Sequence, residues 1–134
     1  MKIEYENSKE VKCYRDFVLN PEDRSAANAF KKCFGADLMA PAVRLHSVLV
    51  EQDSVGVYNK IYGSSDNRIE VVAGVPSKHP KVFKVRISRS YRKFFQQIIK
   101  ESGSVLLVQD WKGDFDSIDT IRVVAVNKHD YRGV

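Results

Sequence analysis

The chain has 134 residues, of which 43% are hydrophobic and 29% are charged, and its formal net charge is +5. This composition predicts a single globular domain over residues 1–134 rather than a disordered chain. No apolar run reaches the roughly 18 residues of a membrane-spanning helix, and the charged N-terminal segment is unlike a signal peptide, so we expect a cytoplasmic protein. Cys13 and Cys33 are too few for a disulfide scaffold or a four-ligand zinc site, and we expect both to be reduced thiols.

The first half of the sequence predicts one strand followed by helices. Residues 2–6 alternate, with Ile3 and Tyr5 on one side, which is typical of a half-buried strand. A helix capped by Asn7 or Ser8 is expected to follow. Later helices are predicted to begin at three places: at Asn20 and Pro21, near Pro41, and at Asp53 and Ser54. Gly35 is a natural stop for the helix that begins at Asn20 and Pro21, and Gly63 for the one that begins at Asp53 and Ser54.

The second half predicts a sheet. Residues 82–88 alternate strictly between apolar and polar or basic side chains, which predicts a strand with one buried face. A tight turn at 89–90 and a returning strand over 91–99 are expected next, then strands over 105–111 and 121–126. The last strand is almost wholly apolar, so we expect it to be central. The fold class is therefore α+β, with the N-terminal strand and two to four helices packed on a twisted antiparallel sheet of about four to five strands.

The excess positive charge is confined to one block of the sequence. Residues 71–100 hold no acidic side chain and eight basic ones, namely Lys78, Lys81, Lys84, Arg86, Arg89, Arg92, Lys93 and Lys100. A block of one sign is costly in self-repulsion and favours an anionic partner. A lysine-rich face that only increases solubility is the alternative interpretation.

Three cations of this block form a candidate phosphate-binding group. Lys84 and Arg86 project from the same face of the predicted strand, with about 6.6 Å between them at ~3.3 Å per residue. Successive phosphates of an extended nucleic acid are separated by about 6–7 Å. If the turn at 89–90 closes a hairpin, Arg92 lies across from this pair. The three side chains are predicted to grip a ribose-phosphate chain, although exposed strands also carry such residues for solubility.

The C-terminal residues 128–132 form a second candidate cluster, directly after the apolar strand. His129 has an ordinary pKa near 6.5, which suits proton transfer, and Tyr131 could stack on a base or donate a proton. A solvated tail is the alternative. The sequence lacks a phosphate-binding glycine loop, a nucleophile elbow and zinc or EF-hand spacing, so we expect neither a metal nor a cofactor.

Two segments carry a resemblance to a known family. F-K-V-R-I-S-R-S-Y-R at 83–92 and I-R-V-V-A-V-N-K-H-D-Y-R at 121–132, preceded by a strand and helices, resemble the RelE/HigB superfamily of bacterial toxins. Its members are endoribonucleases of toxin–antitoxin modules, and many cut messenger RNA on the ribosome. The resemblance is best over 67–131 and implies a RelE-like fold. The sequence departs from many members at position 129, where they have Lys or Arg in place of His129. It also departs at 111–119, where the segment is longer than the usual hairpin of the family.

The resemblance implies roles for individual residues. Arg86 and Arg92 would stabilise the transition state, Lys84 would bind phosphate or act as the base, and His129 would be the acid, with Tyr131 as the family's late tyrosine. The implied RNA-binding residues around them are Lys81, Arg89, Tyr91, Lys93, Lys128 and Arg132. The implied partners are RNA and an acidic antitoxin protein. A non-catalytic nucleic-acid-binding module of the same fold and a protein-interaction domain are the alternative functions.

Overall fold

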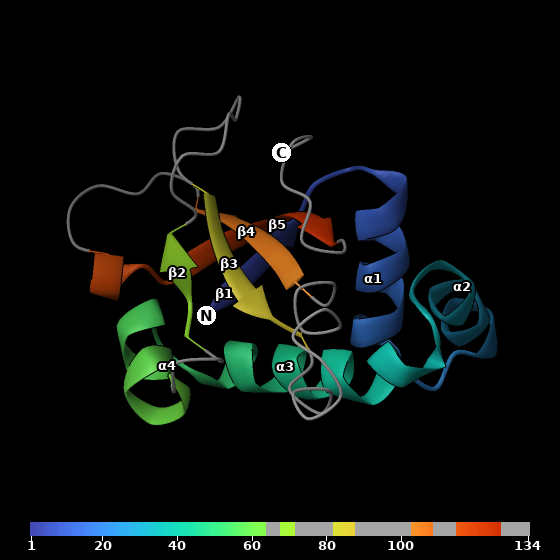
Figure 1. Ribbon diagram of the computed structural model, residues 1–134, viewed down its shortest axis with the longest axis horizontal. Coiled ribbons are helices and arrows are strands. Elements are labelled where there is room, and N and C mark those ends of the chain that lie inside the picture. The colour runs from blue at the N-terminus through green and yellow to red at the C-terminus, as the bar shows by residue number, and fades with distance from the viewer. Residues whose placement is uncertain (64–67, 72–81, 88–102, 109–114, 127–134) are drawn as a thin grey trace.

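The computed structural model describes residues 1–63, 68–71, 82–87, 103–108 and 115–126 (Figure 1). Its described helices are α1 (Lys9–Leu19), α2 (Arg24–Phe34), α3 (Met39–Glu51) and α4 (Val55–Tyr62), with short 3-10 turns η1 (Ala36–Leu38) and η2 (Phe115–Ser117). Its described strands are β1 (Lys2–Tyr5), β2 (Glu70–Val71), β3 (Val82–Arg86), β4 (Gly103–Val108) and β5 (Thr120–Val126). The order of elements therefore places most helices before most strands.

The described strands form one mixed sheet in the order β1-β5-β4-β3-β2. β1 runs parallel to β5, and the other neighbouring strands run antiparallel. The predicted antiparallel, RelE-like sheet is therefore wrong, because the N-terminal strand adds to the last strand in the same direction. In the described part of the chain, the α-helices also hold more residues than the strands do. The strand expected over 91–99 lies outside the described residues.

A β-bulge adjusts which side chains of β5 face the helices. Val105 of β4 pairs with Ala125 while the next residue, Leu106, pairs with Val123, so Val124 is the extra residue of β5. The bulge shifts the alternation, and Ile121, Val123 and Val126 all belong to the main core cluster. β5 lies between β1 and β4, which confirms the expectation that this apolar strand is inside the sheet.

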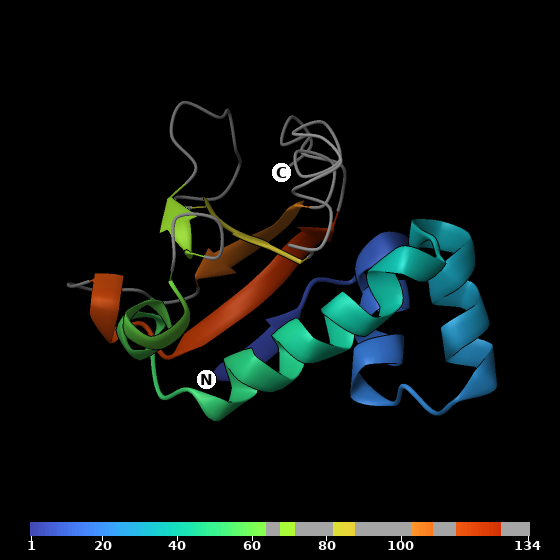
Figure 2. The ribbon, with the colours of Figure 1, turned by 60° about the horizontal axis from the view of Figure 1, so that its bottom comes forward.

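The core lies between the helices and one face of the sheet. Figure 2 shows α3 running along this face, with α1 and α2 together at one end of the molecule. The buried side chains that meet there come from α1, α2, α3, α4, β3 and β5 and include Val11, Phe17, Phe30, Leu45, Leu49, Val55, Val85, Ile121 and Val123. α2 contributes one fully buried residue, Phe30, whose ring centroid lies 4.6 Å from that of Phe17. We call the opposite side of the sheet the second face.

The helix ends follow capping chemistry, with one correction to the sequence prediction. Ser54 caps α4 by accepting a hydrogen bond from the Val57 N–H, as predicted. α2 does not start at Asn20, which is the C-cap of α1. Asp23 is the N-cap instead, and its carboxylate accepts hydrogen bonds from the N–H groups of Ser25 and Ala26 at 2.9 and 3.3 Å.

The lengths of the helices can be compared with the thickness of a membrane. α3, the longest of the described helices, has 13 residues. Over the described ranges, no single helix combines the length and the apolar character needed to cross a membrane. Arg24–Phe34 and Ala36–Glu51 meet that criterion only as a pair, and they are bent by 114° at the break between them.

Gly56 of α4 allows a close approach of η2. A Cβ atom at this position would lie 2.7 Å from both the Cβ and the backbone oxygen of Asp116. Glycine-to-alanine changes inside helices usually stabilise by roughly 0.5–1 kcal/mol. Because the backbone of Asp116 would have to shift to make room, we expect Gly56→Ala to lower the free energy of unfolding by about 1–3 kcal/mol. Urea denaturation measures this value, with the neighbouring exposed-site change Val57→Ala as the control, and a stabilised Gly56→Ala protein would contradict the close packing.

Candidate functional site

Lys84 and Arg86 occupy alternate positions of β3. Val85 between them is 1% exposed and packs in the core, as does Ile87 just after the strand. Because successive residues of a strand point to opposite faces, positions 84 and 86 belong to the second face. The burial of Val85 and Ile87 agrees with the apolar face that the alternation predicts for this strand.

The strand register gives these two positions different neighbours. Arg86 lies opposite Gly103 of β4. Lys84 lies between Val105 of β4 and Glu70 of β2. A carboxylate directly across from an ammonium group contributes roughly 0.2–1 kcal/mol. Glu70 is therefore an acidic neighbour of position 84 that the spacing in the sequence did not reveal.

Besides Glu70 and Lys84, a second pair of oppositely charged residues are register partners at the β1 edge of the sheet. Glu4 of β1 is the register partner of Arg122 of β5. Ile3 and Tyr5, on either side of Glu4, pack against the core, so the alternation of β1 assigns Glu4 to the second face. One carboxylate oxygen of Glu4, Oε2, is buried and accepts no hydrogen bond from the part of the chain that the structure describes. The second face therefore carries both signs of charge along its described strands.

The other residues that the sequence analysis assigned to the site lie outside the described residues. They are Arg92, His129, Tyr131, Lys81, Arg89, Tyr91, Lys93, Lys128 and Arg132. The convergence of Lys84, Arg86 and Arg92 therefore stays a prediction. Over the described ranges, no group of three or more His, Cys, Asp or Glu side chains is arranged to hold a metal ion.

Tyr5 and His46 form a polar pair between β1 and α3. The Tyr5 hydroxyl and His46 Nδ1 lie 3.3 Å apart, within hydrogen-bond distance. Burial raises the pKa of Tyr5 to about 12, an effect that Arg15 partly opposes, and burial lowers the pKa of His46 below 6.5. Both groups are therefore neutral at pH 7. Their hydrogen bond links β1 to α3.

The pair makes folding sensitive to acid. Since the pKa of His46 is lowered in the folded state, its contribution to stability is complete above pH 6.5 and is lost as the pH falls through the lowered value. We expect the imidazole signals of His46 to titrate in NMR spectra with a midpoint below 6.5. We also expect the decline in stability between pH 7 and pH 5 to be smaller in His46→Gln. A midpoint at or above 6.5 would contradict this account.

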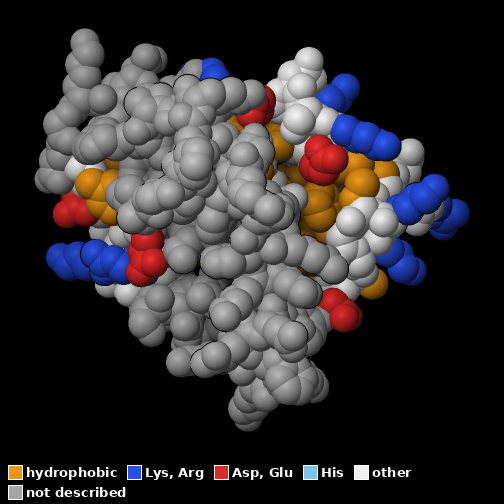
Figure 3. Space-filling view, turned by 45° about the horizontal axis from the view of Figure 1, so that its top comes forward, with side chains coloured by type: hydrophobic (Ala, Val, Ile, Leu, Met, Phe, Trp, Pro, Cys, Tyr) orange, Lys and Arg blue, Asp and Glu red, His pale blue; other side chains and the backbone are white. Residues whose placement is uncertain are grey.

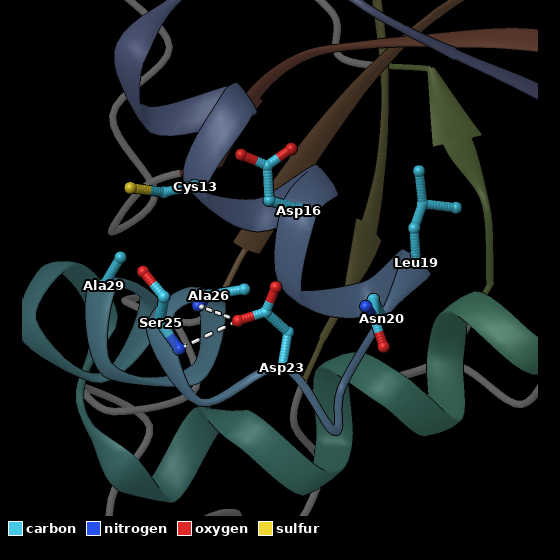
Figure 4. Close-up of a pocket in the computed structure, with 8 residues that line it drawn as sticks. All are labelled: Cys13, Asp16, Leu19, Asn20, Asp23, Ser25, Ala26 and Ala29. Atoms are coloured by element: carbon cyan, nitrogen blue, oxygen red, sulfur yellow. Dashed lines mark hydrogen bonds between the residues drawn. The ribbon is translucent and has the colours of Figure 1, made fainter.

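An open groove of about 430 Å³ lies between α1 and α2 (Figure 4). Its lining residues are Cys13, Asp16, Leu19, Asn20, Asp23, Ser25, Ala26 and Ala29. The carboxylate of Asp23 is already used as the cap of α2, and Asp16 pairs with Arg15 at 2.7 Å. The acidic groups of the groove therefore have partners within the protein. The sulfur of Cys13 lies 3.4 Å from that of Cys33.

The exposed surface of the helical end carries mixed charge. Figure 3 shows blue lysine and arginine side chains with red acidic ones and orange apolar ones between them, on the flank where α1 and α2 lie. The sequence agrees, because these two helices and the turn joining them hold Lys9, Glu10, Lys12, Arg15, Asp16, Glu22, Asp23, Arg24, Lys31 and Lys32. This surface is therefore not a patch of one sign.

Comparison with known proteins identifies no relative of this chain: no family model, no curated protein and no solved structure matches it. The resemblance to the RelE/HigB toxins therefore rests on the sequence segments at 83–92 and 121–132.

Proposed function

We propose that the protein is a metal-independent endoribonuclease of the cytoplasm that cleaves RNA by attack of the ribose 2′-hydroxyl. The observation that carries this proposal is the position of Lys84 and Arg86, on one strand and on the face opposite the core. They belong to a block of 30 residues, 71–100, without an acidic side chain. Such a block favours the phosphate backbone of a nucleic acid over a neutral ligand.

The proposed chemistry needs three kinds of group. A base removes the proton of the 2′-hydroxyl, an acid protonates the leaving 5′-oxygen, and cations stabilise the charge that accumulates on the phosphate. Arg86, with Arg92, supplies the fixed positive charge, since a guanidinium stays protonated and can bind two phosphate oxygens at once. Lys84 binds phosphate or acts as the base, and His129 is the acid. Tyr131 stacks on a base or assists in proton transfer.

The same charge suggests how the activity is restrained. A block of one sign attracts an acidic, flexible protein segment as readily as it attracts RNA. We therefore propose an acidic antitoxin protein as the natural inhibitor, whose carboxylates would occupy the phosphate positions. Inhibition by such a segment would be competitive with RNA and would weaken at high salt.

The test uses the full chain, end-labelled RNA and excess chelator, with and without translating ribosomes. We expect cleavage that persists in chelator and leaves 2′,3′-cyclic phosphate and 5′-hydroxyl ends. RNA with a 2′-deoxyribose at the cleaved position is the matched control and should stay intact. Loss of cleavage in chelator, or cleavage of the deoxy substrate, would overturn the mechanism. RNA that is bound with a steep salt dependence but not cut would identify a non-catalytic binding module.

The proposal makes a prediction for Glu70, the register partner of Lys84. Removing the carboxylate in Glu70→Gln leaves Lys84 without a competing negative charge. We expect RNA affinity to rise about two- to five-fold, which corresponds to roughly 0.4–1 kcal/mol of cross-strand pairing. Filter binding at fixed salt measures the change. Glu51→Gln, which removes the same charge from an exposed position of α3, should leave the affinity unchanged, and an equal gain in both variants would show that only net charge matters.

A further inference from the structure

The two cysteines of the chain lie together although 20 residues separate them. Cys13 is in the second turn of α1 and Cys33 is near the end of α2, and the packing of these helices brings their sulfur atoms to 3.4 Å. Both are free thiols. A disulfide has an S–S distance of about 2.05 Å, so bond formation needs the sulfur atoms to approach by roughly 1.4 Å.

The surroundings of the two thiols differ in a way that sets an order of reaction. Cys33 is exposed to solvent, while Cys13 is only partly accessible and borders the groove between the helices. Burial and the neighbouring Cys33 raise the pKa of Cys13, an effect that Lys9 partly opposes. A dissolved oxidant therefore meets Cys33 first, and Cys13 is placed to attack whatever forms there.

We propose that Cys13 and Cys33 form a thiol-modification site, which a disulfide of a low-molecular-weight thiol converts into an internal disulfide. The Cys33 thiolate attacks one sulfur of the small disulfide, and a mixed disulfide forms as the first small thiolate leaves. The Cys13 thiolate then attacks the Cys33 sulfur, and the second small thiolate leaves. The protein loses two protons and two electrons, and the small disulfide is reduced to two thiols.

The internal disulfide would join α1 to α2 beside the groove. A disulfide between positions 20 residues apart restricts the unfolded chain and so stabilises the folded protein. For a domain of this length, we expect Tm to rise by about 5–10 °C. This thiol chemistry does not depend on RNA cleavage, because it follows from the positions and the exposure of the two cysteines.

The experiment treats the reduced full-length protein with excess oxidised glutathione and measures intact mass under non-reducing conditions. We expect the wild-type protein to lose two hydrogens and to retain no glutathione. We expect Cys13→Ser, which lacks the second thiol, to retain one glutathione on Cys33. In urea, where the helices are unfolded, the ratio of internal to mixed disulfide should fall by about 10-fold or more, because the thiols are no longer held together.

Three results would overturn the inference. One is wild-type protein that keeps glutathione on either cysteine at equilibrium, and another is a wild-type product in which two chains are joined. The third is an internal disulfide that forms equally well in urea and in native buffer. Circular dichroism of Cys13→Ser and Cys33→Ser confirms that both variants are folded before their masses are compared.

Discussion

Replacing both Lys84 and Arg86 by alanine is expected to lower the rate of RNA cleavage by about 10³-fold. Loss of one preorganised group that stabilises transition-state charge typically costs 10²–10³-fold, and the second change removes a phosphate contact as well. The fold should tolerate the double change, because both positions belong to the face of β3 opposite the core. The measurement is the single-turnover rate with saturating protein, which separates the chemical step from RNA binding.

A matched variant separates a specific site from general charge. Lys12→Ala combined with Lys32→Ala removes the same two positive charges from exposed positions of α1 and α2. We expect this control to cleave RNA at nearly the wild-type rate. Arg86→Lys keeps the charge but not the planar, two-pronged donor, and it should lie between wild type and Arg86→Ala. Equal losses in the double variant and the control would refute a site on β3.

Strand alternation and capping residues were sufficient to predict those elements whose structure is decided by neighbouring residues in the sequence. The alternation around Val85 predicted the strand and the burial of Val85 and Ile87, because one buried face fixes the register of a strand. Ser54 and Gly63 correctly marked the start and the end of α4. The start of α2 was misplaced because Asn20 and Asp23 are both good caps, and only the bonds that Asp23 makes to Ser25 and Ala26 distinguish them.

Pairing between distant segments could not be read from spacing. The side-chain pattern of β1 shows that Ile3 and Tyr5 face the core, but it does not specify the parallel pairing with β5. The approach of Cys13 to Cys33 depends likewise on how two helices pack. Lys84 was recognised as part of the candidate site, whereas Glu70 was not, because the strand that carries Glu70 has two residues and too short a pattern to detect.

The position of β2 beside β3 depends on a buried amide. Asn59 of α4 is 8% exposed, and its side chain bonds both backbone groups of Ile69. The Ile69 N–H donates to Asn59 Oδ1 at 2.9 Å, and Asn59 Nδ2 donates to the Ile69 carbonyl at 3.2 Å. Ile69 is 1% exposed and immediately precedes Glu70, the partner of Lys84. Asn59 therefore links the helical core to the strand that borders the candidate site.

Asn59→Ala is expected to lower the free energy of unfolding by about 2–5 kcal/mol. It leaves the buried N–H and C=O of Ile69 without their partner, and each such group costs roughly 1–3 kcal/mol. For a chain of this length, the loss corresponds to a fall in Tm of roughly 10 °C or more. Urea denaturation and thermal unfolding followed by circular dichroism measure both values.

Two further variants test whether the hydrogen bonds, rather than the volume of the side chain, cause the loss. Asn59→Asp preserves the size and the acceptor for the Ile69 N–H but removes the donor and introduces a charge in a buried site, so it should also destabilise strongly. Lys60→Ala, an exposed change in the same helix, should stay within about 0.5 kcal/mol of wild type. If Asn59→Ala cost less than 1 kcal/mol, water would have to replace the amide, and the segment before β2 would not be held as described. In that case the position of Glu70 beside Lys84 would lose its structural basis, whereas the assignment of Arg86 to the second face, which depends on β3 and β4, would stand.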